Sequence, residues 1–162
     1  MKHFILSVAA AALLFLGLPV AGVAYPILQK PVDGEYTIHL FTTGDIHGCY
    51  FDSTYVGGNT RHSLFCAAAA VGRARQQYGE ENVILLDGGD ALQGDNAAYY
   101  YNYVETEKEH VFSRMARYMG YDALVVGNHD IETGHEVYDR VNSTLGIPYL
   151  AGNALKDDGS SY

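Results

Sequence analysis

Three short apolar stretches of the sequence are each followed by side chains that can bind metal ions. The three groups are Asp45 with His47, then Asp90, then Asn128 with His129. Asp45 and His47 are two residues apart, so an extended backbone turns both side chains to the same side. Imidazole nitrogens mixed with carboxylate oxygens suit Zn, Mn or Fe better than Ca, which prefers oxygen ligands alone. A shared Asp could bridge two such ions, and two-metal sites serve in-line displacement at phosphorus.

The apolar stretches are expected to be the strands that position these groups. They cover residues 38–43, 83–86 and 123–126, and a shorter one lies at 148–150. Helical patterns alternate with them, over Leu64 to Tyr78, Thr106 to Met119 and Glu136 to Leu145. This alternation predicts an α/β fold with strands that end at one edge, where open sheets collect their ligands.

The three polar groups lie in stretches that resemble the first three motif blocks of the calcineurin-like metallophosphoesterases. The stretches are Asp45-Ile46-His47-Gly48, Gly88 to Gly94 and Gly127 to Gly134. The branch they look most like comprises secreted 5′-nucleotidases and 2′,3′-cyclic-nucleotide phosphodiesterases. The similarity runs from Thr37 to Asn153. The order and spacing of the three blocks together are more specific than any one block.

The resemblance implies a pair of divalent metal ions, Zn, Mn or Fe. It implies Asp45 and His47 as ligands of the first ion, Asp90 as a bridge between the ions, and Asn128 as a ligand of the second. The implied reaction is hydrolysis of a nucleotide phosphate ester by attack of a metal-bound hydroxide on phosphorus. Cyclic nucleotides and UDP-sugars are alternative substrates, because the three blocks do not separate these classes.

The resemblance also assigns roles within the third block. It implies that His129 stabilises or protonates the leaving group, and that the acid three residues later orients this imidazole. That acid is Glu132, where Asp is common, and Asp130 stands where the family often has Glu. The two catalytic candidates, His129 and Glu132, are three residues apart.

Two later blocks of the family, of the Gly-His and Gly-His-x-His types, are not in this sequence. His135 follows Gly134, but it lies within the third block. We therefore interpret residues 25–162 as the N-terminal portion of a metallophosphoesterase catalytic domain, an incomplete βα sandwich whose remaining C-terminal part is expected in the same enzyme. An inactive metal-binding or nucleotide-binding module is the alternative from a different class.

The first residues have the composition of a signal peptide. Met1-Lys2-His3 precedes an apolar run over residues 4–18, and Pro19 ends that run. The run is short for a membrane span, and the small residues before Ala24 suit cleavage after it. Residues 1–24 are therefore expected to direct export to the periplasm or the outside, with no stable membrane span. An uncleaved anchor is the alternative.

The chain carries a formal charge of −9, which argues against a nucleic-acid polymer as partner. A phosphate ester remains compatible, because bound divalent cations invert the field that the substrate meets. Cys49 and Cys66 allow either one disulfide or two separate thiols.

Two polar or aromatic features have a plain structural interpretation. Tyrosines 99, 100, 101 and 103 could form a stacking surface for a nucleobase, but packing is the expected role. His110 is expected on the surface of the helix over residues 106–119.

Overall fold

The computed structural model describes residues 34–53 and 62–160. The signal peptide expected over residues 1–24 lies outside these ranges. From Tyr36 onward the described residues belong to one compact unit. Within the described ranges, no helix combines the length and the apolar character needed to cross a membrane.

One parallel sheet organises this unit, and its strands stand in the order in which the chain makes them. The strands are β1 (His39–Thr43), β2 (Val83–Asp87), β3 (Ala123–Val125) and β4 (Tyr149–Leu150). Each neighbouring pair is parallel, so all the carboxyl ends lie at the same edge. The prediction that three strands deliver their polar groups to a common edge is confirmed.

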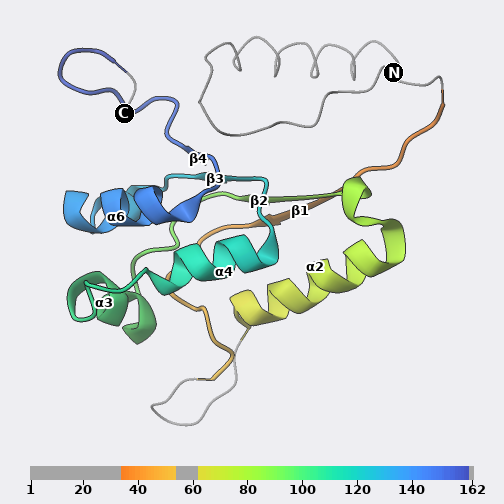
Figure 1. Cartoon of the computed structure of the whole chain (residues 1–162), viewed down its shortest axis with the longest axis horizontal. Helices are drawn as coiled ribbons and strands as arrows, with labels where there is room; N and C mark the ends of the chain where they lie inside the picture. The colour runs from red at the N-terminus through yellow and green to blue at the C-terminus, as the bar shows by residue number, and fades with distance from the viewer. Residues whose placement is uncertain (1–33, 54–61, 161–162) are drawn as a thin grey trace. The chain divides into compact units, whose positions relative to one another are not determined.

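Helices follow each of the first three strands. They are α2 (Leu64–Tyr78), the short 3₁₀ helix η1 (Glu80–Asn82), α3 (Asn96–Tyr103), α4 (Val111–Met119), α5 (Asn128–Ile131) and α6 (His135–Leu145). Figure 1 shows α2 and α4 along the same face of the sheet, with α2 against β2 and α6 against α4. The bounds predicted for α2 are confirmed, and Gly79, at φ +90°, ends it.

The two faces of the sheet differ in what covers them. On the face toward the helices, Leu85 and Leu124 are fully buried. On the other face, Leu40, Ile84 and Leu150 are 61%, 36% and 51% exposed. The strands therefore carry apolar side chains on both faces, as strands of parallel sheets do when both faces are covered.

The helix predicted over residues 106–119 begins at Val111, five residues later than predicted. The predicted surface position of His110 was wrong. His110 is fully buried and caps α4, because its Nδ1 accepts the Phe112 N–H at 3.1 Å. With Nδ1 as acceptor, Nε2 carries the proton and donates to Asn102 Oδ1 at 3.0 Å. Burial lowers the pKa of His110 to about 4.

The tyrosine-rich stretch forms α3, and packing explains only part of it. Tyr99, Tyr100 and Tyr103 are 61%, 45% and 50% exposed, so the expected packing role is wrong for these three. Tyr99 and Tyr103 contact each other edge to face, with ring centroids 5.2 Å apart. The sequence was ambiguous here because tyrosine suits both a core and a wet surface.

Candidate metal centre

The loop after β1 runs alongside the loop after β2. The Asp45 N–H donates to Gly89 O at 3.0 Å, and the His47 N–H donates to Asp90 O at 2.8 Å. These bonds continue the strand pairing past the ends of β1 and β2. The first two polar groups of the sequence are therefore held side by side by their backbones.

Three residues of these loops have a backbone that L-amino acids rarely adopt. Asp45, His47 and Asp90 have φ values of +51°, +46° and +59°, and no other non-glycine residue in the described ranges has a positive φ. The left-handed conformation is unfavourable for a residue with a Cβ and is found where surrounding contacts impose it, often at functional sites. All three were predicted from the sequence as metal ligands.

The side chains of the three loops meet at the edge of the sheet. His47, Asp90 and His129 each offer a ligand atom, and these atoms lie within 4.8 Å of one another. The carboxylate of Asp45 is close by, with its Oδ1 3.9 Å from His47 Nε2. Asn128 is the first residue of α5, directly before His129. Two imidazoles with carboxylates in a half-exposed cluster fit a transition-metal ion.

Gly127 is required at the start of the third loop. A Cβ at this position would overlap the carboxylate and the backbone nitrogen of Asp90. The second and third loops are in direct contact here, because the His129 N–H donates to Asp90 Oδ1 at 2.8 Å. Asp90 therefore contacts the third loop with the same carboxylate that was predicted to bind metal.

Glu132 contacts His129, as the Asp common at this position in the resembled family is expected to do, and its longer side chain is accommodated. His129 Nδ1 lies 2.7 Å from Glu132 Oε2, and this hydrogen bond raises the pKa of His129 above its ordinary value. With Nδ1 engaged by the carboxylate, Nε2 is the ring atom free for chemistry at the cluster.

Two buried acids around the cluster were not assigned a role from the sequence. Asp87 ends β2, is 3% exposed, and accepts hydrogen bonds from the Thr43 hydroxyl and the Gly89 N–H. Burial raises its pKa. Asp130 is fully buried and accepts backbone N–H groups from the second and third loops. An acid directly after a strand is a visible signal for Asp87, and Asp130 stands in the third motif block, but neither signal specified a role.

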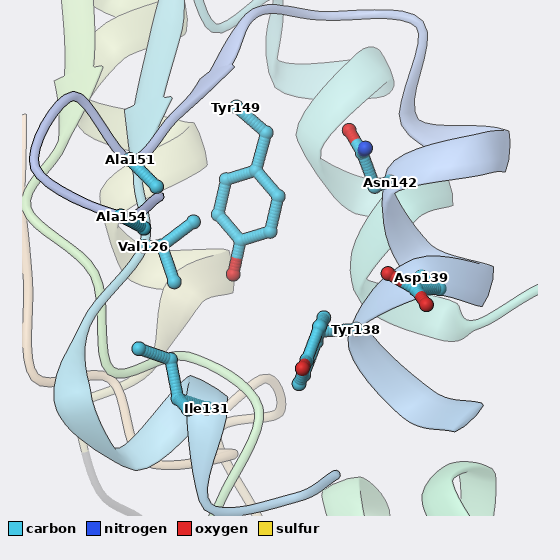
Figure 2. Close-up of a pocket in the computed structure, with 8 residues that line it drawn as sticks. All are labelled: Val126, Ile131, Tyr138, Asp139, Asn142, Tyr149, Ala151 and Ala154. Carbon is cyan, nitrogen blue, oxygen red and sulfur yellow. The ribbon is translucent and has the colours of Figure 1, made fainter. Parts of the chain in front are cut away.

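A hollow of about 210 Å³ lies between α5, α6 and the end of β4 (Figure 2). Tyr149 projects into it between Val126 and Tyr138, and its hydroxyl is buried close to the Asp130 carboxylate. Burial raises the pKa of Tyr149 well above its usual range, and the charge of Asp130 adds to this. None of the predicted metal ligands lines the hollow.

Both cysteines are free thiols in this structure. Cys49 follows the first ligand loop, and Cys66 is exposed on α2. Of the two arrangements allowed by the sequence, separate thiols are the one observed. The loop is held by backbone bonds instead, such as the Leu64 N–H to Cys49 O at 2.9 Å.

The sequence is similar to part of several curated 5′-nucleotidases and to part of the protein UshA. It is 33% identical to a 5′-nucleotidase of Bos taurus over 138 residues, which are 78% of this chain and 22% of the relative. It is 27% identical to the protein UshA of Salmonella pullorum, over 75% of this chain and 20% of that protein. The chain thus spans about a fifth of the length of these curated relatives. No protein-family model matches it.

Solved structures give the fold. The calcineurin-like phosphoesterase YfkN from Bacillus subtilis matches 76% of this chain with a TM-score of 0.68 at 24% sequence identity, over 39% of its own length. The chain has the fold of the calcineurin-like phosphoesterases. A putative 5′-nucleotidase from Staphylococcus aureus matches the same share with a TM-score of 0.66 at 22% identity, over 24% of its length. The resemblance inferred from the three motif blocks is confirmed, as is the α/β fold class.

Proposed function

We propose that the chain is the N-terminal part of a metal-dependent hydrolase of nucleotide phosphate esters. The observation that carries this proposal is the meeting of His47, Asp90 and His129 at the carboxyl edge of a parallel sheet. The similarity to 5′-nucleotidases favours nucleotides as the substrate class. The donor set suits Zn, Mn or Fe.

Four side chains are proposed to hold two divalent ions. Asp45 and His47 would hold the first ion, Asn128 the second, and Asp90 would contribute to both. When bound, the ions would activate a water molecule and stabilise the charge on the phosphoryl oxygens. Asp45 is 82% exposed at its side chain, so it is open to an ion arriving from solvent.

His129 is proposed as the proton donor to the leaving oxygen. Glu132 holds its Nδ1 at 2.7 Å, which orients the ring and favours the protonated form. Nε2 then faces the cluster with a proton to give. Glu132 acts through His129 and is a positioning residue.

The role of the first residues is proposed from the sequence alone. Residues 1–24 are proposed as a signal peptide and residues 25–162 as part of the catalytic domain. The protein would then act on nucleotides in the periplasm or outside the cell. The support is the apolar run over residues 4–18 and its basic start.

The test is His129→Ala in the full-length enzyme that contains this chain and the expected C-terminal part, with Mn²⁺ binding and hydrolysis of a nucleoside monophosphate measured on the same preparation. We expect turnover to fall by about 10²- to 10⁴-fold while Mn²⁺ is retained. His135→Ala is the matched control, because His135 lies in the same block with a side chain 71% exposed. Normal turnover in His129→Ala would contradict the proposed role.

A second candidate is a metal-binding module without turnover. The observation that favours it is that His129 itself belongs to the three-residue cluster. If His129 binds an ion, the site loses its proton donor. In that case His129→Ala loses Mn²⁺ affinity, and the wild-type chain binds Mn²⁺ but hydrolyses neither nucleoside monophosphates nor cyclic nucleotides nor UDP-sugars.

A further inference from the structure

Asp130 is a fully buried carboxylate that accepts four backbone N–H groups from two of the ligand loops. Its Oδ1 accepts the N–H groups of Ala91 and Leu92, each at 2.8 Å. Its Oδ2 accepts the N–H groups of Asp90 at 2.9 Å and Gly127 at 2.8 Å. One side chain thus binds three consecutive amides of the second loop and the first amide of the third.

Two of the four bonds act on the two residues whose geometry the cluster needs most. Asp90 has a left-handed backbone at φ +59°, and the bond from its own N–H helps to impose this conformation. Gly127 packs against the Asp90 carboxylate, and the bond from its N–H holds it there. The bond to Gly127 is half of a capping box at the start of α5, because Asp130 is the third residue of that helix.

We propose that Asp130 is a positioning residue that sets the distance between Asp90 and the third ligand loop, and thereby the metal affinity of the centre. This inference rests on the proposed metal site. Asp130 touches no metal in this proposal. It acts through Asp90, in the way that groups behind metal ligands orient them and tune their affinity.

The geometry predicts which substitution is most harmful. Each carboxylate oxygen of Asp130 accepts two N–H groups. An Asn at this position has an NH₂ group in place of one oxygen, so this group faces two N–H donors whichever way the amide is turned. Two buried N–H groups then lose their acceptor. Asp130→Glu keeps both oxygens and moves them by one methylene group.

The experiment compares Asp130→Asn, Asp130→Glu and Val141→Ala in the full chain. Val141 is fully buried in α6 and belongs to the hydrophobic core, so Val141→Ala controls for lost stability. Mn²⁺ affinity is measured by calorimetry and thermal stability without metal by circular dichroism. We expect Asp130→Asn to bind Mn²⁺ about 10- to 100-fold more weakly, Asp130→Glu to bind more tightly than Asp130→Asn, and Val141→Ala to bind as wild type. Wild-type affinity in Asp130→Asn, or an equal loss in Val141→Ala, would overturn the proposal.

Amide hydrogen exchange on the metal-free wild type keeps the test decisive if Asp130→Asn does not fold. The proposal expects slow exchange at Ala91 and Leu92, because both amides are bonded to a buried acceptor. Exchange at unprotected rates would overturn it. A wild-type chain that binds no Mn²⁺ but protects both amides would count against the proposed function, while the anchoring of the loop by Asp130 would stand.

Discussion

The ligand edge of the sheet and the core beneath it are built by opposite means. The core uses relaxed backbones and apolar side chains, and its centre is Leu85 and Leu124, both with no exposed surface. The edge uses left-handed backbones at three non-glycine residues, and these are stabilised by backbone hydrogen bonds between loops. The difference teaches that stability and metal affinity should respond to different substitutions in this chain.

The largest expected effect is on the core side of this comparison. Leu85→Ala should lower the free energy of unfolding by about 2–5 kcal/mol, because it leaves a cavity between β2 and the helices. Leu40→Ala is the matched control on the opposite face, where the side chain is 61% exposed, and should change stability by less than about 0.5 kcal/mol. Urea unfolding checks both values. If stability and metal affinity depend on different residues, the folded fraction of each variant binds Mn²⁺ with the affinity of the wild type.

Acid should weaken the fold through a residue that belongs to the core, not the edge. The pKa of His110 is 6.5 as a free group and about 4 in the folded chain, because burial disfavours its charged form and Arg140 adds to the shift. The unfolded chain therefore binds the proton first, so stability is intact above pH 6.5 and falls as the pH drops toward 4. The loss is roughly 3 kcal/mol.

Unfolding in urea at pH 7 and at pH 4 measures this loss, and His110→Gln should reduce the dependence on pH. The raised pKa of Asp87 has the opposite effect on stability, favouring the folded state as the pH falls. Asp87 is present in both the wild type and His110→Gln, so it does not affect their comparison. An equal slope in the two proteins would show that other groups cause the acid sensitivity.

The edge should respond to a single added methyl group. Gly127→Ala places a Cβ where the Asp90 carboxylate lies, so we expect Mn²⁺ affinity to fall by about 10- to 100-fold. The backbone of Gly127 is not left-handed, since its φ is −86°, so the effect comes from the overlap alone. Gly152→Ala meets no atom within 4 Å and serves as control. Equal affinities in the two variants would break the distinction between edge and core.

The smallest effect on stability is expected on the exposed face of the sheet. Leu40→Lys with Leu150→Lys should shift the urea midpoint little, because both side chains are more than half exposed. Both should raise the soluble fraction, because apolar side chains gathered on an exposed sheet favour association. Light scattering on the wild type checks the premise, since a monomeric wild type at high concentration would contradict it.

Much of the fold could be predicted from the sequence because its signals are local. The bounds of α2 follow from an alanine-rich helical pattern that stops at Gly79, and those of β2 follow from an apolar run. The start of α4 could not be predicted, because it depends on His110 and on Asn102 in the preceding helix. A histidine that caps a helix from inside the core looks like a surface residue in the sequence.

The candidate site divides in the same way. Asp45, His47 and Asp90 could be found because each follows a strand and the parallel order brings the strand ends together. The pairing of His129 with Glu132 was implied by the resemblance, which places an acid three residues after this histidine. The anchoring role of Asp130 could not, because its bonds to the second loop span 38 to 40 residues, a distance over which spacing carries no information.

The bonds of Asp130 also set an order of events during synthesis. Asp90 leaves the ribosome 40 residues before the side chain that accepts its N–H. At roughly 5–20 residues per second, that interval is on the order of seconds. Throughout it the second loop lacks this anchor, and a nascent chain that stops just before residue 130 holds all four proposed ligands without the group that spaces them. Under the proposal for Asp130, tight metal binding has to wait until residue 130 has been made.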